Sequence, residues 1–176
     1  MNNIVTYKDK IPQIADTAYI NPYAIVIGDV VIGEGVSLWP GVIIRADDDR
    51  IEIGANTAVL DRAMIEAPRG KPVVIGEDVL ISHGAVLHGC TVEAGALIGI
   101  SANILDGAVI GEGSVVGASA MVPPGTNIPP RSKALGIPAS VAGRVSDEEL
   151  EQIQQERRRV MEKAKEYGQW FVTKQI

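Results

Sequence analysis

Hydrophobic residues recur every six positions along most of this chain. The repeat passes through three changes of register, with three residues inserted before Ile53, four inserted before Ile75 and one deleted before Val92. A strict period of six matches neither the 3.6-residue period of a helix nor an isolated two-residue alternation. The pattern therefore predicts a solenoid in which each repeat forms one flat side. All eighteen register positions are Ile, Leu or Val: Ile14, Ile20, Val26, Ile32, Leu38, Ile44, Ile53, Val59, Ile65, Ile75, Ile81, Leu87, Val92, Ile98, Ile104, Ile110, Val116 and Val122.

Glycine directly follows the register residue in six of these repeats. A short strand that turns a corner needs a residue that tolerates positive φ, and glycine does so at no steric cost. We therefore expect positive φ at these positions, which are Gly33, Gly54, Gly76, Gly99, Gly111 and Gly117.

The repeat pattern stops after Val122. Residues 123–145 are rich in proline, which lacks a backbone donor, so we expect this segment to leave the solenoid. Ser146 and Glu149 then form a capping box, and apolar residues follow at helical spacing to about Tyr167. The sequence thus predicts a β-helix domain over residues 1–145 and a C-terminal α-helix within residues 146–176 that packs on the prism of its own or a neighbouring chain. The charged run 156–159 is interpreted as a solvated helix face.

Composition and charge exclude several functions. Only 4% of the residues are aromatic, so small branched side chains are expected to fill the interior. The formal net charge is −6 and the pI is near 4.9, which disfavours binding to nucleic acid. No apolar run reaches the roughly 20 residues that cross a bilayer. The N-terminus lacks the apolar core of a signal peptide, and the one cysteine, Cys90, is interpreted as a packing residue. We expect a cytoplasmic protein.

Stacked repeats place polar side chains in vertical files, since neighbouring strands lie about 4.8 Å apart. The positions directly after three register residues put Arg45, Glu66 and His88 in one file. Asp61 and His83, each two residues past a register position, fall in another file. Five residues of extended chain separate the two histidines by roughly 16 Å at most, too far for one metal ion with ligands at about 2.1 Å. Two chains side by side could share such an ion.

The stretches IIRADDDRIEIGANTAVLD and PVVIGEDVLISHGAVLHGCTV resemble the γ-class carbonic anhydrase-like family of hexapeptide-repeat proteins. This resemblance implies an all-β, left-handed parallel β-helix of about six coils, each with three sides, and a homotrimer. It also implies a zinc, iron(II) or cobalt(II) ion bound by three histidines from two subunits, with carbon dioxide and bicarbonate as the substrates. Zinc suits this reaction because it lowers the pKa of bound water to about 7.

The family's metal ligands match this chain in part. His83 and His88 match two of the histidines, and Glu66 stands in place of the third. Leu60 replaces the glutamine that orients the metal-bound hydroxide in the family. Two histidines and one glutamate are a known zinc ligand set, but Arg45 could instead hold Glu66 in an ion pair with no metal. Both interpretations of Glu66 stay open.

Further residues take roles from the resemblance. Arg45 and Asp47, with Asp61 nearby, match residues that form ion pairs across the trimer interface. Asp48 stands at the position where the archetypal member of the family has a catalytic acidic residue. Asp48 and Asp61 are therefore the candidate catalytic carboxylates, although a solvated loop carboxylate is the simpler interpretation of Asp48. Trp39 is expected to point outward and be buried between subunits. Three functions remain: a weak metal-dependent carbon dioxide hydratase, a hexapeptide acyltransferase that uses acyl-CoA, and a non-catalytic trimeric scaffold.

Overall fold

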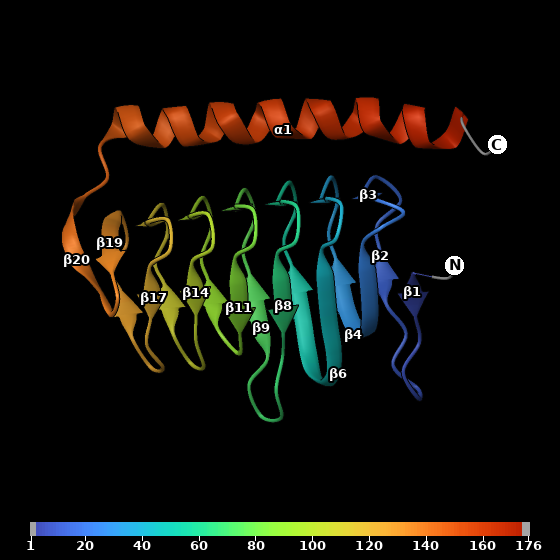
Figure 1. The fold of residues 1–176 in the computed structure, drawn as a ribbon, viewed down its shortest axis with the longest axis horizontal. Helices are drawn as coiled ribbons and strands as arrows, with labels where there is room; N and C mark the ends of the chain where they lie inside the picture. Colours follow the sequence, from blue (N-terminus) through green and yellow to red (C-terminus); the bar gives the residue numbers. More distant parts are fainter. Residues whose placement is uncertain (1–2, 174–176) are drawn as a thin grey trace.

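The register residues stack in three columns, one on each side of a triangular prism (Figure 1). The computed structural model describes the backbone of residues 3–173 and the side chains of residues 3–169. The chain is a left-handed parallel β-helix of about seven turns with one C-terminal helix, which confirms the predicted fold class. Isoleucine, leucine and valine fill the interior because branched side chains pack well on a pleated surface, and most register residues are fully buried.

Each side of the prism is a ladder of short parallel strands. The first side contains β2 (Gln13–Ile14), β9 (Val73–Ile75), β12 (Thr91–Val92), β15 (Val109–Ile110) and β18 (Asn127–Ile128). The second contains β3 (Tyr19–Ile20), β5 (Ser37–Leu38), β7 (Ala58–Val59), β10 (Leu80–Ile81), β13 (Leu97–Ile98), β16 (Val115–Val116) and β19 (Ser132–Gly136). The third contains β1 (Ile4–Val5), β8 (Met64–Glu66), β11 (Val86–His88), β14 (Asn103–Ile104) and β17 (Met121–Val122).

Two longer strands run around one corner of the prism. These are β4 (Ile25–Ile32) and β6 (Ile43–Ile53), which begin on the third side and end on the first. They join those two sides into one hydrogen-bonded sheet, while the second side forms a separate sheet.

The prediction that residues 123–145 leave the solenoid is wrong. Ile128 pairs with Ile110, and Ala134 pairs with Val116, so the register continues beyond Val122. In earlier coils the residue after the register position donates its N–H to the next coil, as Gly111 does to Ile128. The corresponding residue in the last coil is Pro129, whose missing N–H has no further coil to meet. Pro129 therefore ends the stack without leaving an unpaired N–H that could pair with a further strand. The chain then turns back as β20 (Ala139–Arg144), antiparallel to β19.

The glycines after the register residues also differ from the expectation. None of the six has positive φ; that conformation falls two residues further on, for instance at Asn56, Asp78 and Ser101. The glycines are needed because the next coil passes close by. A Cβ on Gly76 would lie 2.7 Å from the backbone nitrogen of Ala94. Close approach of two backbones, and not the turn conformation, excludes larger residues there.

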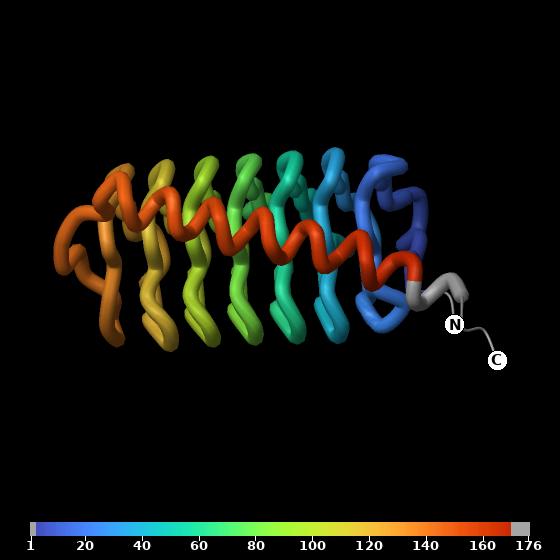
Figure 2. The backbone as a smooth tube through the Cα atoms, turned by 90° about the horizontal axis from the view of Figure 1, so that it is seen from above, coloured from blue at the N-terminus to red at the C-terminus, as the bar shows by residue number. Residues whose placement is uncertain are grey.

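The C-terminal helix α1 (Asp147–Thr173) lies along the whole prism (Figure 2). Its predicted capping box is confirmed, since the Ser146 N–H donates to Glu149 Oε2 at 2.9 Å and the Glu149 N–H donates to Ser146 Oγ at 3.2 Å. The helix extends six residues beyond the predicted end at Tyr167, and residues 174–176 of the predicted range lie outside the described part. It packs on its own prism, against β3 and β7. No helix within residues 3–173 is long and apolar enough to cross a membrane.

One residue of the charged helix run is buried, contrary to the prediction. Arg157 is 7% exposed, and its Nη1 donates to the carbonyl of Asn56 at 2.8 Å. Its Nη2 lies 2.8 Å from an Asp78 carboxylate oxygen. Arg157 therefore holds the helix to the positive-φ residues of two successive coils. Arg158 and Arg159 of the same run are exposed, as expected.

Trp39 is buried by its own chain, which corrects the expectation that it lies between subunits. Its ring is 5.2 Å from that of Tyr167 on α1 and 6.5 Å from that of Tyr19 (centroid to centroid). Its exposed fraction is 6%. This aromatic cluster anchors the C-terminal half of the helix on the prism.

We expect Gly76→Ala to destabilise the protein by about 1–3 kcal/mol, because the new methyl group would overlap backbone that cannot move without shifting a coil. Gly143→Ala is the matched control, since a Cβ there meets nothing within 4 Å. Urea unfolding monitored by circular dichroism measures both. Equal midpoints for the two variants would contradict the close-approach explanation.

We expect Arg157→Met to lower the free energy of unfolding by about 1–3 kcal/mol, because it leaves a carbonyl and a partly buried carboxylate without their charged donor. The control is Arg158→Met, which removes an exposed ion pair with Glu151 and should change stability by less than about 0.5 kcal/mol. Limited proteolysis of α1 provides a second measurement. If both variants resist cleavage equally, Arg157 does not hold the helix.

Candidate functional site

A file of polar side chains crosses the third side of the prism. Strand pairing places Arg45 on β6 opposite Glu66 on β8, and Glu66 opposite His88 on β11. The predicted file is therefore confirmed. These residues point outward because their neighbours, such as Ile65 and Leu87, are fully buried inside the prism.

Arg45 binds two carboxylates of its own chain. Its Nη1 lies 3.1 Å from Asp47 Oδ2, and its Nη2 lies 2.5 Å from Glu66 Oε1. The hydrogen bond to Asp47 is the main cause that raises the pKa of Arg45, and the charge of Glu66 adds to it. The ion pair that competes with a metal role for Glu66 is thus present within one chain.

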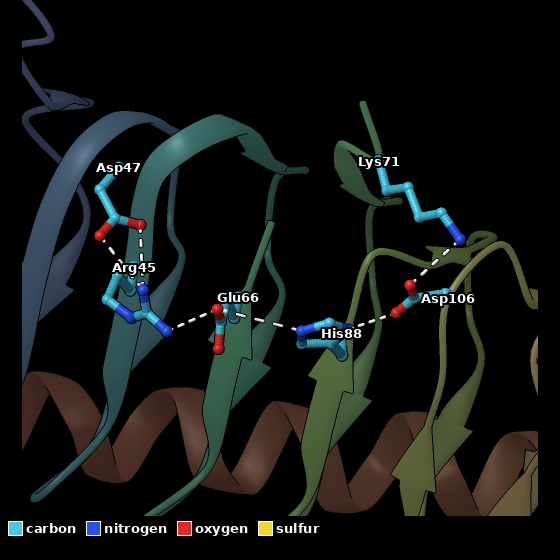
Figure 3. Close-up of polar contacts among 6 residues, drawn as sticks. All are labelled: Arg45, Asp47, Glu66, Lys71, His88 and Asp106. Carbon is cyan, nitrogen blue, oxygen red and sulfur yellow. Dashed lines mark hydrogen bonds and ion pairs between the residues drawn. The ribbon is translucent and has the colours of Figure 1, made fainter. Parts of the chain in front are cut away.

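His88 lies between two carboxylates (Figure 3). Its Nδ1 makes a very short hydrogen bond with Asp106, and its Nε2 lies 3.9 Å from Glu66 Oε1. The second oxygen of Asp106 is 3.1 Å from Lys71 Nζ. The hydrogen bond from His88, followed by that from Lys71, lowers the pKa of Asp106. An ionised carboxylate only accepts, so His88 Nδ1 is the donor to Asp106; in a neutral imidazole the lone pair then lies on Nε2.

Sequence reasoning missed both Asp106 and Lys71. Asp106 is two residues past its register position, and a count of that offset on the third side would have placed it near His88. Lys71 belongs to the four residues inserted before Ile75, whose path the period does not determine.

His83 and Asp61 form a second pair on a neighbouring corner. His83 Nδ1 lies 3.0 Å from Asp61 Oδ2, as the predicted file requires. In both pairs the contact to the aspartate is made by Nδ1, which leaves Nε2 on the other side of the ring. Among the described residues, no three His, Cys, Asp or Glu side chains of one chain converge on a common point.

The remaining predicted residues lie around this file. Asp48 is exposed where the β6 strand passes the corner, and Lys10 Nζ donates to its carbonyl at 3.0 Å. Leu60 is 8% exposed and presents only apolar atoms. Cys90 is buried, which raises the pKa of its thiol to about 12 and confirms the packing role.

The ligand atoms present fit half of a metal centre. Two ligands of a tetrahedral zinc ion at about 2.1 Å lie roughly 3.4 Å apart. The 3.9 Å between His88 Nε2 and Glu66 Oε1 is close to this separation. Hydrogen bonding of Nδ1 to a carboxylate is also the usual state of a metal-binding histidine. A zinc centre would need a third protein ligand besides this pair.

The fold and these files define a hexapeptide-repeat protein, and the family pattern Bacterial transferase hexapeptide (six repeats) matches residues 12–46. A carbonic anhydrase of Geobacillus kaustophilus is 41% identical over 164 residues, which is 93% of this chain and 90% of that protein. The mitochondrial gamma carbonic anhydrase 1 of Arabidopsis thaliana is 42% identical over 104 residues, which is 56% of this chain and 38% of that protein. The chain belongs to the γ-class carbonic anhydrase-like family of hexapeptide-repeat proteins.

Solved structures agree on the scaffold. A hexapeptide transferase family protein from Anaplasma phagocytophilum superposes with a TM-score of 0.90 at 31% identity, over 95% of this chain and 99% of that one. Proteins with different names thus share this fold, so the fold alone does not determine the reaction.

Proposed function

We propose that this protein is a weak, metal-dependent carbon dioxide hydratase whose sites lie between the subunits of a homotrimer. The observation that carries the proposal is that the two histidines make the same contact. Each turns Nδ1 toward a carboxylate, Asp61 for His83 and Asp106 for His88. In the neutral form each ring would then carry its lone pair on Nε2, the atom turned away from that carboxylate.

The third ligand would come from a second chain. Glu66 and His88 of one subunit and His83 of a neighbouring copy would hold zinc, iron(II) or cobalt(II). The third side is suited to such packing because α1 covers the second side and leaves the third uncovered. Its outward positions carry a column of mostly apolar residues that are exposed or half-buried in the single chain, interrupted by Asn103: Ile25, Ile43, Met64, Val86 and Met121.

A bound divalent ion would supply the Lewis acidity that makes water a nucleophile near neutral pH. The protein's own residues set how well this works. Arg45 holds the Glu66 carboxylate in place at 2.5 Å, which orients it but also competes for its charge. Leu60 offers no hydrogen bond to orient a reacting hydroxide, so we expect a low rate. Asp48 is exposed and would exchange protons with solvent.

Two alternative functions have support from particular contacts. The Arg45–Glu66 ion pair satisfies both charges without a metal, which favours a trimeric scaffold. The His88–Asp106 pair resembles the general base that an acyltransferase needs. Against transfer from acyl-CoA, Glu66 stands 3.9 Å from His88 Nε2, where the nucleophile of a substrate would have to lie.

We expect about one Zn²⁺ or Co²⁺ per chain, since one site forms at each of three interfaces. His83→Gln and His88→Gln should each lose the ion. Co-expression of the two variants should restore about a quarter of the sites, because a mixed interface can combine one intact histidine from each chain. Metal content is measured by plasma emission spectroscopy, and the assembly by light scattering.

These results separate the proposal from its rivals. Under about 0.1 ion per chain after dialysis against either metal would exclude a metal centre and favour the scaffold. Metal in both single variants would exclude the two histidines as ligands. Binding of coenzyme A in calorimetry, without metal, would instead support acyl transfer.

We expect Glu66→His to tighten zinc binding at least about tenfold, because a neutral imidazole is free of the competing Arg45. Arg45 keeps Asp47 as a partner in this variant. Adding Leu60→Gln should then raise the rate of carbon dioxide hydration, measured by stopped flow with a pH indicator. Glu52→His, an outward position on β6, is the control and should change neither. A double variant no faster than Glu66→His would show that residue 60 does not face the reaction.

A further inference from the structure

Asp106 and Lys71 form a support for His88, and both lie outside the two stretches that carry the family resemblance. We propose that Asp106, held in turn by Lys71, is a positioning residue that fixes the His88 ring with Nε2 directed at Glu66. The inference rests on the proposed function in one respect: there, the fixed ring serves to present His88 as a metal ligand. The fixed ring itself can be tested separately.

The Asp106 carboxylate is engaged on both oxygens. Oδ1 accepts from His88 Nδ1, and Oδ2 lies 3.1 Å from Lys71 Nζ. The backbone at this point is also tied down, because the Asp106 carbonyl accepts the Gly125 N–H at 2.8 Å. A carboxylate with two charged or polar donors has little freedom to rotate. His88 is therefore held from the side opposite to Glu66.

Lys71 reaches Asp106 because of an insertion in the repeat. It belongs to the segment 67–72 between β8 and β9, which carries the four extra residues of that coil and projects from the prism (Figure 1). Figure 3 shows the Lys71 side chain pointing from this segment toward Asp106. The insertion thus delivers a cation to the coil that follows His88.

Gly89 allows this segment to lie against the strand that carries His88. Its φ is +55°, and a Cβ there would lie 3.0 Å from Lys71 Cβ and 3.3 Å from Pro68 Cδ. The glycine directly after His88 therefore has a steric role: it leaves space for the base of the Lys71 side chain. The loop, the glycine and Asp106 act together on one imidazole.

The chemical consequence concerns the tautomer of His88. Neutral imidazole carries its proton on either nitrogen, and the partner of one nitrogen decides which. A carboxylate at Nδ1 selects the Nδ1–H form and leaves the Nε2 lone pair free for a ligand. Outer-sphere partners of this kind are worth about 10- to 100-fold in metal affinity.

The tautomer is measured on full-length protein labelled with [15N]histidine, by long-range 1H–15N correlation at about pH 8, where imidazole is neutral. The chain has two histidines, so His83→Gln assigns the remaining signals to His88. We expect the Nδ1–H form of His88 in this background and a mixture, or the Nε2–H form, after Asp106→Ala. Lys71→Met should shift the population in the same direction by less. Asp29→Asn, a control of similar exposure paired with Arg50, should leave it unchanged. An unaltered tautomer in Asp106→Ala would overturn the inference.

Cobalt titration, followed by visible absorption, tests the purpose of the support in chains with His83 intact. We expect Asp106→Asn to bind Co²⁺ about 10- to 100-fold more weakly than the unaltered protein. Affinity equal to that of the unaltered protein would contradict a role for Asp106 toward the metal. Absence of Co²⁺ binding by the unaltered protein would contradict the proposed function. The tautomer measurement would still show whether Asp106 fixes the His88 ring.

Discussion

The structure depends on one spacing, that between hydrogen-bonded parallel strands. Every coil must lie about 4.8 Å from the next over its whole circumference, because each of the three sides is a ladder of hydrogen-bonded parallel strands. A residue is therefore surrounded by the equivalent residues of neighbouring coils. Branched side chains fill the interior columns, and glycine is required wherever the next coil's backbone passes within about 3 Å of a Cβ, as at Gly54 and Gly76.

The same spacing governs the electrostatics of the outer file. Side chains in adjacent coils are close enough for direct ion pairs, so like charges stacked in register would repel. Along the third side the carboxylates of Asp47, Glu66 and Asp106 are instead separated by the guanidinium of Arg45 and the imidazole of His88. Each group lies between partners of opposite or complementary character. This polar file can persist at the surface of the prism because each of its carboxylates has a donor within the chain.

The period of six was sufficient to predict the strand register, the file of Arg45, Glu66 and His88, and the pair of Asp61 and His83. Those placements follow from counting, since equivalent positions must stack. The period could not predict Lys71, whose inserted segment has no register. The period also could not show that Arg157 is buried. The helix α1 rises about 5.4 Å per turn, whereas the coils lie about 4.8 Å apart. Because the two repeats do not match, side-chain packing decides which helix residue faces the prism. The prolines at the end of the repeat do not interrupt the register, because a missing N–H donor matters only where another coil follows.

The division between inward and outward positions also explains how this scaffold can change its chemistry. Ile65 is fully buried and Glu66, the next residue, is outward, so a substitution at 66 alters the site without opening a cavity in the core. Stability comes from the interior columns, whereas the reaction depends on a few outward side chains supported by neighbouring coils. A histidine-to-glutamate exchange at such a position costs the fold little, because Arg45 is already placed to accept the new charge. Under the proposed function, departures from the family pattern at residues 60 and 66 would therefore alter the rate and the metal affinity and leave the prism unchanged.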